Sequence, residues 1–213
     1  MPMIMIGDWK ATLNMVDGMR KNAGKAAAQA VRDEAFLFQR QVVKAFREQG
    51  SGGKKWKPLN VITLALRRGA SKVGGQGSRG TNALVRSGSL RASVKVEQVT
   101  PDTLFVGVKR AAGQYKGTSG KGGAAIVDVG SIHETGHVII PITDKMRRYF
   151  RFLFWKGVIP FPWPPPNKSY ILIPRRSFLR DTLVEFEKGF KDRMLRRYVA
   201  YLTGKGRLKL ATE

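Results

Sequence analysis

The chain has 213 residues, 42% of them hydrophobic, and its 39 lysines and arginines outnumber 15 acidic residues to give a formal net charge of +24. This length is enough for one large domain with a hydrophobic core. Cysteine is absent, which excludes disulfides, thiolate metal sites and cysteine nucleophiles, and no apolar stretch approaches the roughly 20 residues of a membrane span.

The positive charge leaves three interpretations open. A strongly basic chain attracts polyanions, so the charge can serve contact with a DNA backbone or docking to an acidic protein neighbour. It can equally be a solvated surface that keeps the protein soluble. No zinc-finger spacing, basic zipper or aromatic RNA-binding signature is present to decide between them.

The first half of the chain predicts a helix, a loop and a hairpin. After an N-terminal extension over residues 1–25, apolar residues recur at three- and four-residue steps within 26–49, which predicts an amphipathic helix. The stretch 69–81 is rich in glycine and serine and predicts a loop. Alternation over 90–99, a turn at 100–102 and a return over 103–108 predict a β-hairpin.

The second half alternates loops, short elements and a long final helix. A glycine-rich loop is expected at residues 110–123, a short helix at 125–134 and a strand at 138–140. The segment 144–168 looks like an insertion, an aromatic, proline-rich arm that begins with a helix over 144–155. A strand at 170–173 and a helix at 178–202 complete a predicted single domain, 26–203, before a basic tail at 204–213.

These elements predict an α+β fold. We expect a mainly antiparallel sheet packed against two long amphipathic helices, with extended loops and the aromatic, proline-rich arm.

Two motifs invite an enzymatic interpretation. His133-Glu134-Thr135-Gly136-His137 matches H-E-x-x-H, in which a helix brings two histidines to one zinc ion. Glycine is common just past a helix end, and a β-branched run with a proline follows, so the helix should end near Glu134 and the imidazoles should not converge. Residues 75–80 match G-x-G-x-x-G but lack the preceding buried strand of a dinucleotide site. We therefore expect no metal, cofactor or catalytic residue.

The aromatic residues predict two different environments. Trp56, beside the first helix and followed by Pro58, favours a core anchor over an interface. The arm is too dense in aromatics and prolines for an ordinary core helix and favours a partner surface, with packing onto its own domain as the alternative. The interface candidates are Phe152, Phe154, Trp155, Phe161 and Trp163.

An ordered set of short motifs runs through most of the chain. Pro174 ends the strand at Ile173, and Ser177 is a candidate N-cap for the helix that follows. The set consists of Trp56, Pro58, Leu59, Leu84, Gly88, Leu90, His133, Gly136, Pro174, Arg175, Phe178 and Leu179. Together these residues resemble the virion-morphogenesis, or tail-completion, family of tailed bacteriophages over residues 36–186.

The resemblance implies a non-enzymatic structural subunit of the neck, joining the head connector to the tail. It implies a homo-oligomeric ring, of about six or twelve subunits, that contacts neighbouring neck and tail proteins. Non-specific contact with packaged DNA is a further expectation, and a membrane partner is not. Such a protein is synthesised in the host cytoplasm and located in the virion. The alternative from another class is a basic DNA-binding protein that acts as a monomer or dimer.

Overall fold

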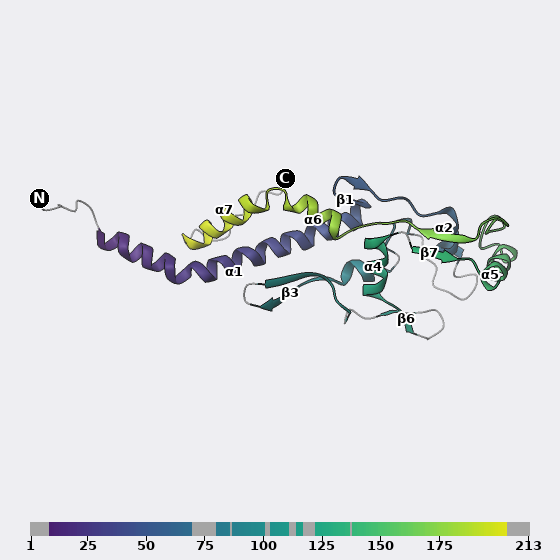
Figure 1. Ribbon diagram of the computed structural model, residues 1–213, viewed down its shortest axis with the longest axis horizontal. Helices are drawn as coiled ribbons and strands as arrows, with labels where there is room; N and C mark the ends of the chain where they lie inside the picture. The colour runs from purple at the N-terminus through teal and green to yellow at the C-terminus, as the bar shows by residue number, and fades with distance from the viewer. Residues whose placement is uncertain are drawn as a thin grey trace, which may run out of the picture. The chain divides into compact units, whose positions relative to one another are not determined.

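A computed structural model of the chain describes residues 9–69, 80–85, 87–100, 103–110, 114–116, 122–136 and 138–203 (Figure 1). The expected basic tail and much of the two expected glycine-rich loops lie outside these residues. The described part contains the helices α1 (Trp9–Glu48), α2 (Val61–Gly69), α3 (Ser89–Ala92), α4 (Ile126–Thr135), α5 (Asp144–Trp155), α6 (Arg180–Glu187) and α7 (Phe190–Leu202). None of these helices is both long and apolar enough to cross a membrane.

The strands of the described residues form four separate two-stranded sheets. The pairs are β1 (Gly50–Ser51) with β2 (Lys54–Lys55), β3 (Val94–Thr100) with β4 (Thr103–Val108), β5 (Gln114–Lys116) with β6 (Gly122–Ala125), and β7 (Val138–Pro141) with β8 (Tyr170–Ile173). The α+β class is thus confirmed, but small antiparallel sheets replace the single sheet that we expected. Three of the four pairs join strands that are neighbours in sequence, so each can form without a common sheet.

The chain folds as two compact units. One comprises residues 1–38, 96–106 and 186–213, and the other comprises residues 39–95 and 107–185. We refer to them as the small unit and the large unit and describe each by itself.

In the small unit, a buried ion-pair network joins α1 to α7, which run side by side (Figure 1). Glu34 is only 2% exposed, and its carboxylate lies 2.7 Å from Arg197 Nε and 3.2 Å from Arg193 Nε. Asp33 adds an ion pair to Arg197 and accepts a hydrogen bond from Tyr201. The three α7 residues are spaced four apart, so they share one helix face.

An aromatic contact supports the same pair of helices. The Phe38 ring lies 5.2 Å from the Phe186 ring, which also contacts Phe190 at 5.9 Å. The prediction of a single final helix is wrong, because the structure has two helices here, α6 and α7. Between them lies Gly189, whose φ of 73° is left-handed. Glycine adopts this conformation at little cost, so it permits the chain to turn and α7 to begin afresh.

The large unit contains the main hydrophobic clusters. Phe46 of α1 packs at 4.9 Å from the Phe178 ring and at 5.7 Å from the Trp56 ring. A second cluster lies between α2 and α5 and consists of the buried residues Ile62, Phe150, Leu153, Val158 and Ile159. The first cluster includes Phe178, which belongs to the strand–helix connection that forms the candidate site.

Four sequence predictions, α4, β7, α5 and β8, are confirmed within a residue or two. The β3–β4 hairpin is also confirmed, but β3 begins at Val94 instead of residue 90, because the helix α3 occupies the start of the predicted strand. Other elements differ from the prediction. The first helix begins at Trp9 instead of residue 26, α2, α3 and the β1–β2 pair were not predicted, and β5 and β6 occupy part of a predicted loop. Strand β6 begins with two glycines, and because glycine is depleted in strands, this composition favours a loop prediction.

Candidate functional site

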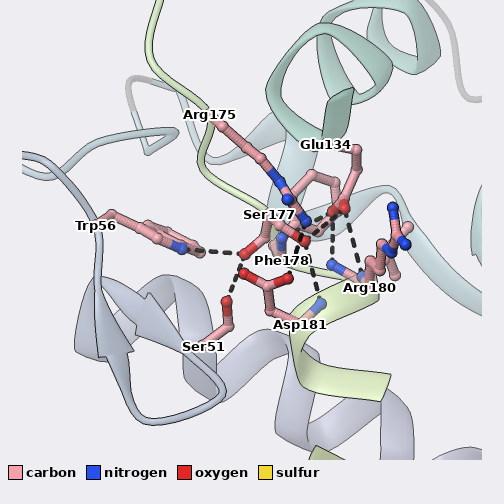
Figure 2. A network of polar contacts seen from close by, with 9 residues as sticks. Ser51, Trp56, Glu134, Arg175, Ser177, Phe178, Arg180 and Asp181 are labelled. Carbon is pink, nitrogen blue, oxygen red and sulfur yellow. Dashed lines mark hydrogen bonds and ion pairs between the residues drawn. The ribbon is translucent and has the colours of Figure 1, made fainter. Parts of the chain in front are cut away.

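The candidate site is the connection from β8 to α6, which we call the Ser177 junction (Figure 2). As the Ile-Pro step predicts, β8 ends at Ile173 and the chain continues without regular structure through Ser177. The first turn of α6 follows and presents backbone N–H groups that have no acceptor within the helix.

Glu134, at the end of α4, supplies the missing acceptors. Its Oε1 accepts from the backbone N–H groups of Phe178 at 2.7 Å and Leu179 at 2.6 Å. Its Oε2 accepts from Ser177 Oγ at 2.7 Å and from the N–H of Arg180 at 3.3 Å. Figure 2 shows the carboxylate facing this row of donors. Both oxygens of the glutamate are therefore engaged in capping a distant helix.

Ser177 joins three segments through two of its atoms. Its Oγ, besides donating to Glu134, accepts from the N–H of Asp181 at 3.1 Å, so the predicted capping role is confirmed. Its carbonyl accepts from Trp56 Nε1 at 3.0 Å and from Ser51 Oγ. Trp56 thus packs within the large unit by its ring and anchors the junction by its indole N–H, as the core-anchor interpretation predicts.

Gly136 ends α4 with its N–H donating to Ile132 O at 2.9 Å, which confirms the predicted C-cap. Its φ of 70° with ψ of −177° is a conformation open essentially to glycine alone. A Cβ at this position would lie 2.7 Å from Arg175 Cα, so the close approach of these two segments of the chain also requires glycine. The Arg175 side chain in turn pairs with Asp181 at 2.9 Å.

Arg176 places a cation in the interior of the large unit. The residue is 6% exposed, and its guanidinium donates to the carbonyls of Lys57 at 3.1 Å and Pro58 at 3.3 Å. Burial, and secondarily the charge of Arg67, lower its pKa. Within the described residues its hydrogen-bond acceptors are carbonyl oxygens and not carboxylates, so the guanidinium remains a net positive charge at this place.

His133 lies beside this arginine. Its carbonyl accepts from the Arg176 N–H at 2.9 Å, and its Nδ1 is buried without a partner among the described residues. Burial, followed by the Arg176 charge, lowers the pKa of the imidazole to about 4, so the side chain is neutral at pH 7.

The H-E-x-x-H motif is divided by the end of α4. The helix stops at Thr135, near the predicted place, while His137 lies outside the described residues. Glu134, which would serve as the base in a zinc protease, is committed to the N-terminus of α6. Over the described residues, no three histidine or acidic side chains gather closely enough to hold a metal ion.

Many of the motif positions meet around this junction. Trp56, Pro58, His133, Gly136 and Arg175 contact it as described above, and Phe178 and Leu179 belong to it. Leu90 and Phe178 both approach Gly130 of α4. Leu84 holds a left-handed φ of 59° and, with Leu59 and Pro174, lines the adjacent groove, while Gly88 precedes α3.

The five interface candidates separate into two groups. Trp155 is 80% exposed, Phe152 is 47% exposed and Phe161 is 42% exposed. Phe154 and Trp163 instead pack against the cluster between α2 and α5, and Trp163 makes an edge-on contact with Phe150 at 4.5 Å.

A groove of about 1210 Å³ opens beside the junction; it is lined by β8 and by no residue of β7. Its walls come from β8, from the segment that includes α2, and from the residues around α3. His133 and Arg176 face it from the junction. Sequence analysis missed this groove and the role of Arg176, and the only available signal was a second arginine after the Ile-Pro step.

Comparison with protein-family models, with curated proteins and with solved structures finds no match for this chain.

Proposed function

We propose that the chain is a non-enzymatic structural subunit of the neck of a tailed bacteriophage, a tail-completion protein that assembles as a ring between head connector and tail. The observation that carries this proposal is the convergence of the motif residues on the Ser177 junction. Residues as far apart in sequence as Trp56, Gly136 and Arg175 meet in one network of hydrogen bonds and close backbone contacts. Residues that meet in this way determine the fold. A shared fold is what we expect members of a family of structural subunits to have in common.

The commitment of Glu134 supports the non-enzymatic part of the proposal. A general base needs an oxygen that can reach a substrate or a metal-bound water. Both oxygens of Glu134 accept hydrogen bonds from the start of α6. The residue with the most suggestive spacing for catalysis thus has a structural role.

Exposed apolar side chains support the assembly part. On α1, Trp9, Leu13 and Val16 follow helical spacing and are each at least half exposed. On the aromatic arm, Trp155 and Phe152 are exposed as well. Large exposed apolar groups mark protein–protein contact surfaces, so we assign the arm to contact with a neighbouring subunit or neck protein.

The alternative of a basic DNA-binding protein is favoured by one observation, the net charge of +24. It predicts binding to duplex DNA that weakens steeply with salt, without formation of a closed assembly. The ring proposal predicts a closed assembly, with or without DNA contact.

The test is Trp155→Ala, with Val99→Ala as a matched control, since Val99 is 61% exposed and lies outside the arm. Both variants should unfold at the wild-type temperature, because an exposed side chain contributes little to the core. Only Trp155→Ala should fail to join rings or phage particles, as judged by sedimentation and electron microscopy. If Trp155→Ala assembles normally, the assignment of the arm to an interface is wrong. If the wild-type protein binds DNA as a monomer and never assembles, the DNA-binding alternative is favoured.

A further inference from the structure

The groove beside the Ser177 junction follows the outer edge of a β-strand. It is lined by all four residues of β8, Tyr170–Ile173, and by no residue of β7. In the part of the chain that the structure describes, β8 pairs with β7 alone. One edge of β8 is therefore open to the groove.

The register identifies the backbone groups at this open edge. The Ile142 N–H donates to Ser169 O at 2.8 Å, which makes these two residues a hydrogen-bonded pair in line with the β7–β8 register. Hydrogen-bonded and non-hydrogen-bonded pairs alternate along antiparallel strands. Ile171 and Ile173 thus face β7, while Tyr170 and Leu172 direct their N–H and C=O groups into the groove.

The charge of the groove has one sign. Lys57, Arg67, Lys168 and Arg176 line it, and no aspartate or glutamate is among its described lining residues. Arg176 is buried and bonded to carbonyls, so its charge is not neutralised locally. The neighbouring His133 is neutral at pH 7 and neither adds to nor offsets these cations.

Between the cations, the lining is apolar. Ile62, Leu90 and Phe150 are buried side chains that border the groove, and Leu66 and Trp163 add partly buried surface. An open strand edge that meets apolar pockets is the arrangement that binds extended peptides by strand addition. The main chain supplies hydrogen bonds, and alternate side chains supply contacts with the pockets.

We propose that this groove binds an extended acidic segment of a partner protein, which adds as a strand to the outer edge of β8. Its alternate apolar side chains lie on the groove lining, and its carboxylates face the four cations. This inference uses only the geometry of the groove and stands apart from the proposed phage function.

Two other occupants fit the groove less well. A second copy of this chain would bring further positive charge to the groove. Although the chain has 15 acidic residues, no described strand contains more than one of them. Duplex DNA presents phosphates, which bind to open basic surfaces and use neither a strand edge nor an apolar lining. An acidic extended peptide uses the edge, the lining and the cations together.

The test uses fluorescence anisotropy with a labelled peptide of about six residues in which glutamate alternates with valine. A peptide with lysine in place of glutamate is the control probe. The full-length protein should bind the acidic peptide and not the basic one. Lys57→Glu combined with Lys168→Glu should weaken binding by about tenfold or more, since two attractive surface charges become repulsive. Lys188→Glu combined with Lys191→Glu, exposed and outside the groove, should leave binding unchanged.

A second pair of variants tests the strand edge. Leu172→Pro removes an N–H that faces the groove and spares the β7 ladder, whereas Leu172→Ala removes only the side chain. Binding should be lost in the proline variant and much less reduced in the alanine variant, which loses lining surface but keeps the N–H, with unchanged circular dichroism showing that both fold. The proposal is overturned if the acidic peptide does not bind, if it binds equally to the Lys57→Glu, Lys168→Glu protein, or if duplex DNA alone binds in a way that these charge reversals abolish.

Discussion

Replacement of Glu134 by alanine should destabilise the large unit severely, because this carboxylate caps a helix in another part of the chain. The variant leaves the N–H groups of Phe178 and Leu179 without their acceptor. Each orphaned group costs about 1–3 kcal/mol, and loss of the negative charge at the start of α6 removes about 0.3–1 kcal/mol more. Because Glu134 is only partly buried, water replaces some of these bonds, and we expect a total loss of about 2–4 kcal/mol.

The assay is thermal unfolding followed by circular dichroism, with urea unfolding as a second measure. For a protein of this size, the expected loss lowers the melting temperature by about 5–15 °C. Glu134→Gln keeps one acceptor oxygen and should fall between alanine and wild type. Glu185→Ala is the matched control, since Glu185 is exposed on α6 and has no bond to the junction. A Glu134→Ala protein that melts with the Glu185→Ala control would refute the capping role.

Four further outcomes follow from the same structure. Gly136→Ala should cost about 3 kcal/mol or more in urea unfolding, since φ is left-handed and the space is closed. Glu34→Ala should cost about 3–5 kcal/mol by the same measurement, because two arginines lose their buried partner. Since the folded pKa of His133 is about 4, below its unfolded value, its contribution to stability is complete above about pH 6.5 and is lost as the pH falls toward 4. His133→Asn should flatten the pH dependence of the unfolding free energy in that window, and an unchanged slope would contradict the assignment. Trp163→Ala should lower the melting temperature, in contrast to the exposed Trp155.

The elements that sequence analysis located correctly are those with a local signal. Strand β8 lies between a loop and a proline, and α5 shows helical periodicity under a Thr143 cap that accepts from the Met146 N–H. Each of these signals lies within a few residues of the element it defines. The break at Gly189 also had a local signal, a glycine within a predicted helix, and the apolar spacing on both sides concealed it.

The candidate site depended on contacts that no local pattern encodes. Glu134 is separated from Ser177 by 43 residues, and Glu34 from Arg193 by 159 residues. In sequence, Glu134 completes a metal-binding spacing, and Glu34 interrupts the apolar stripe of α1. Only the folded chain shows that one carboxylate caps α6 and that the other pairs with two arginines of α7, of which Arg197 is buried.

The central claim, that this chain is a subunit of a ring, is tested most directly by native mass spectrometry of the purified protein, with negative-stain electron microscopy of the same sample. The account predicts a single closed oligomer of defined subunit number, seen as rings. A monomer or dimer at every concentration, also in the presence of neck and tail components, would contradict it.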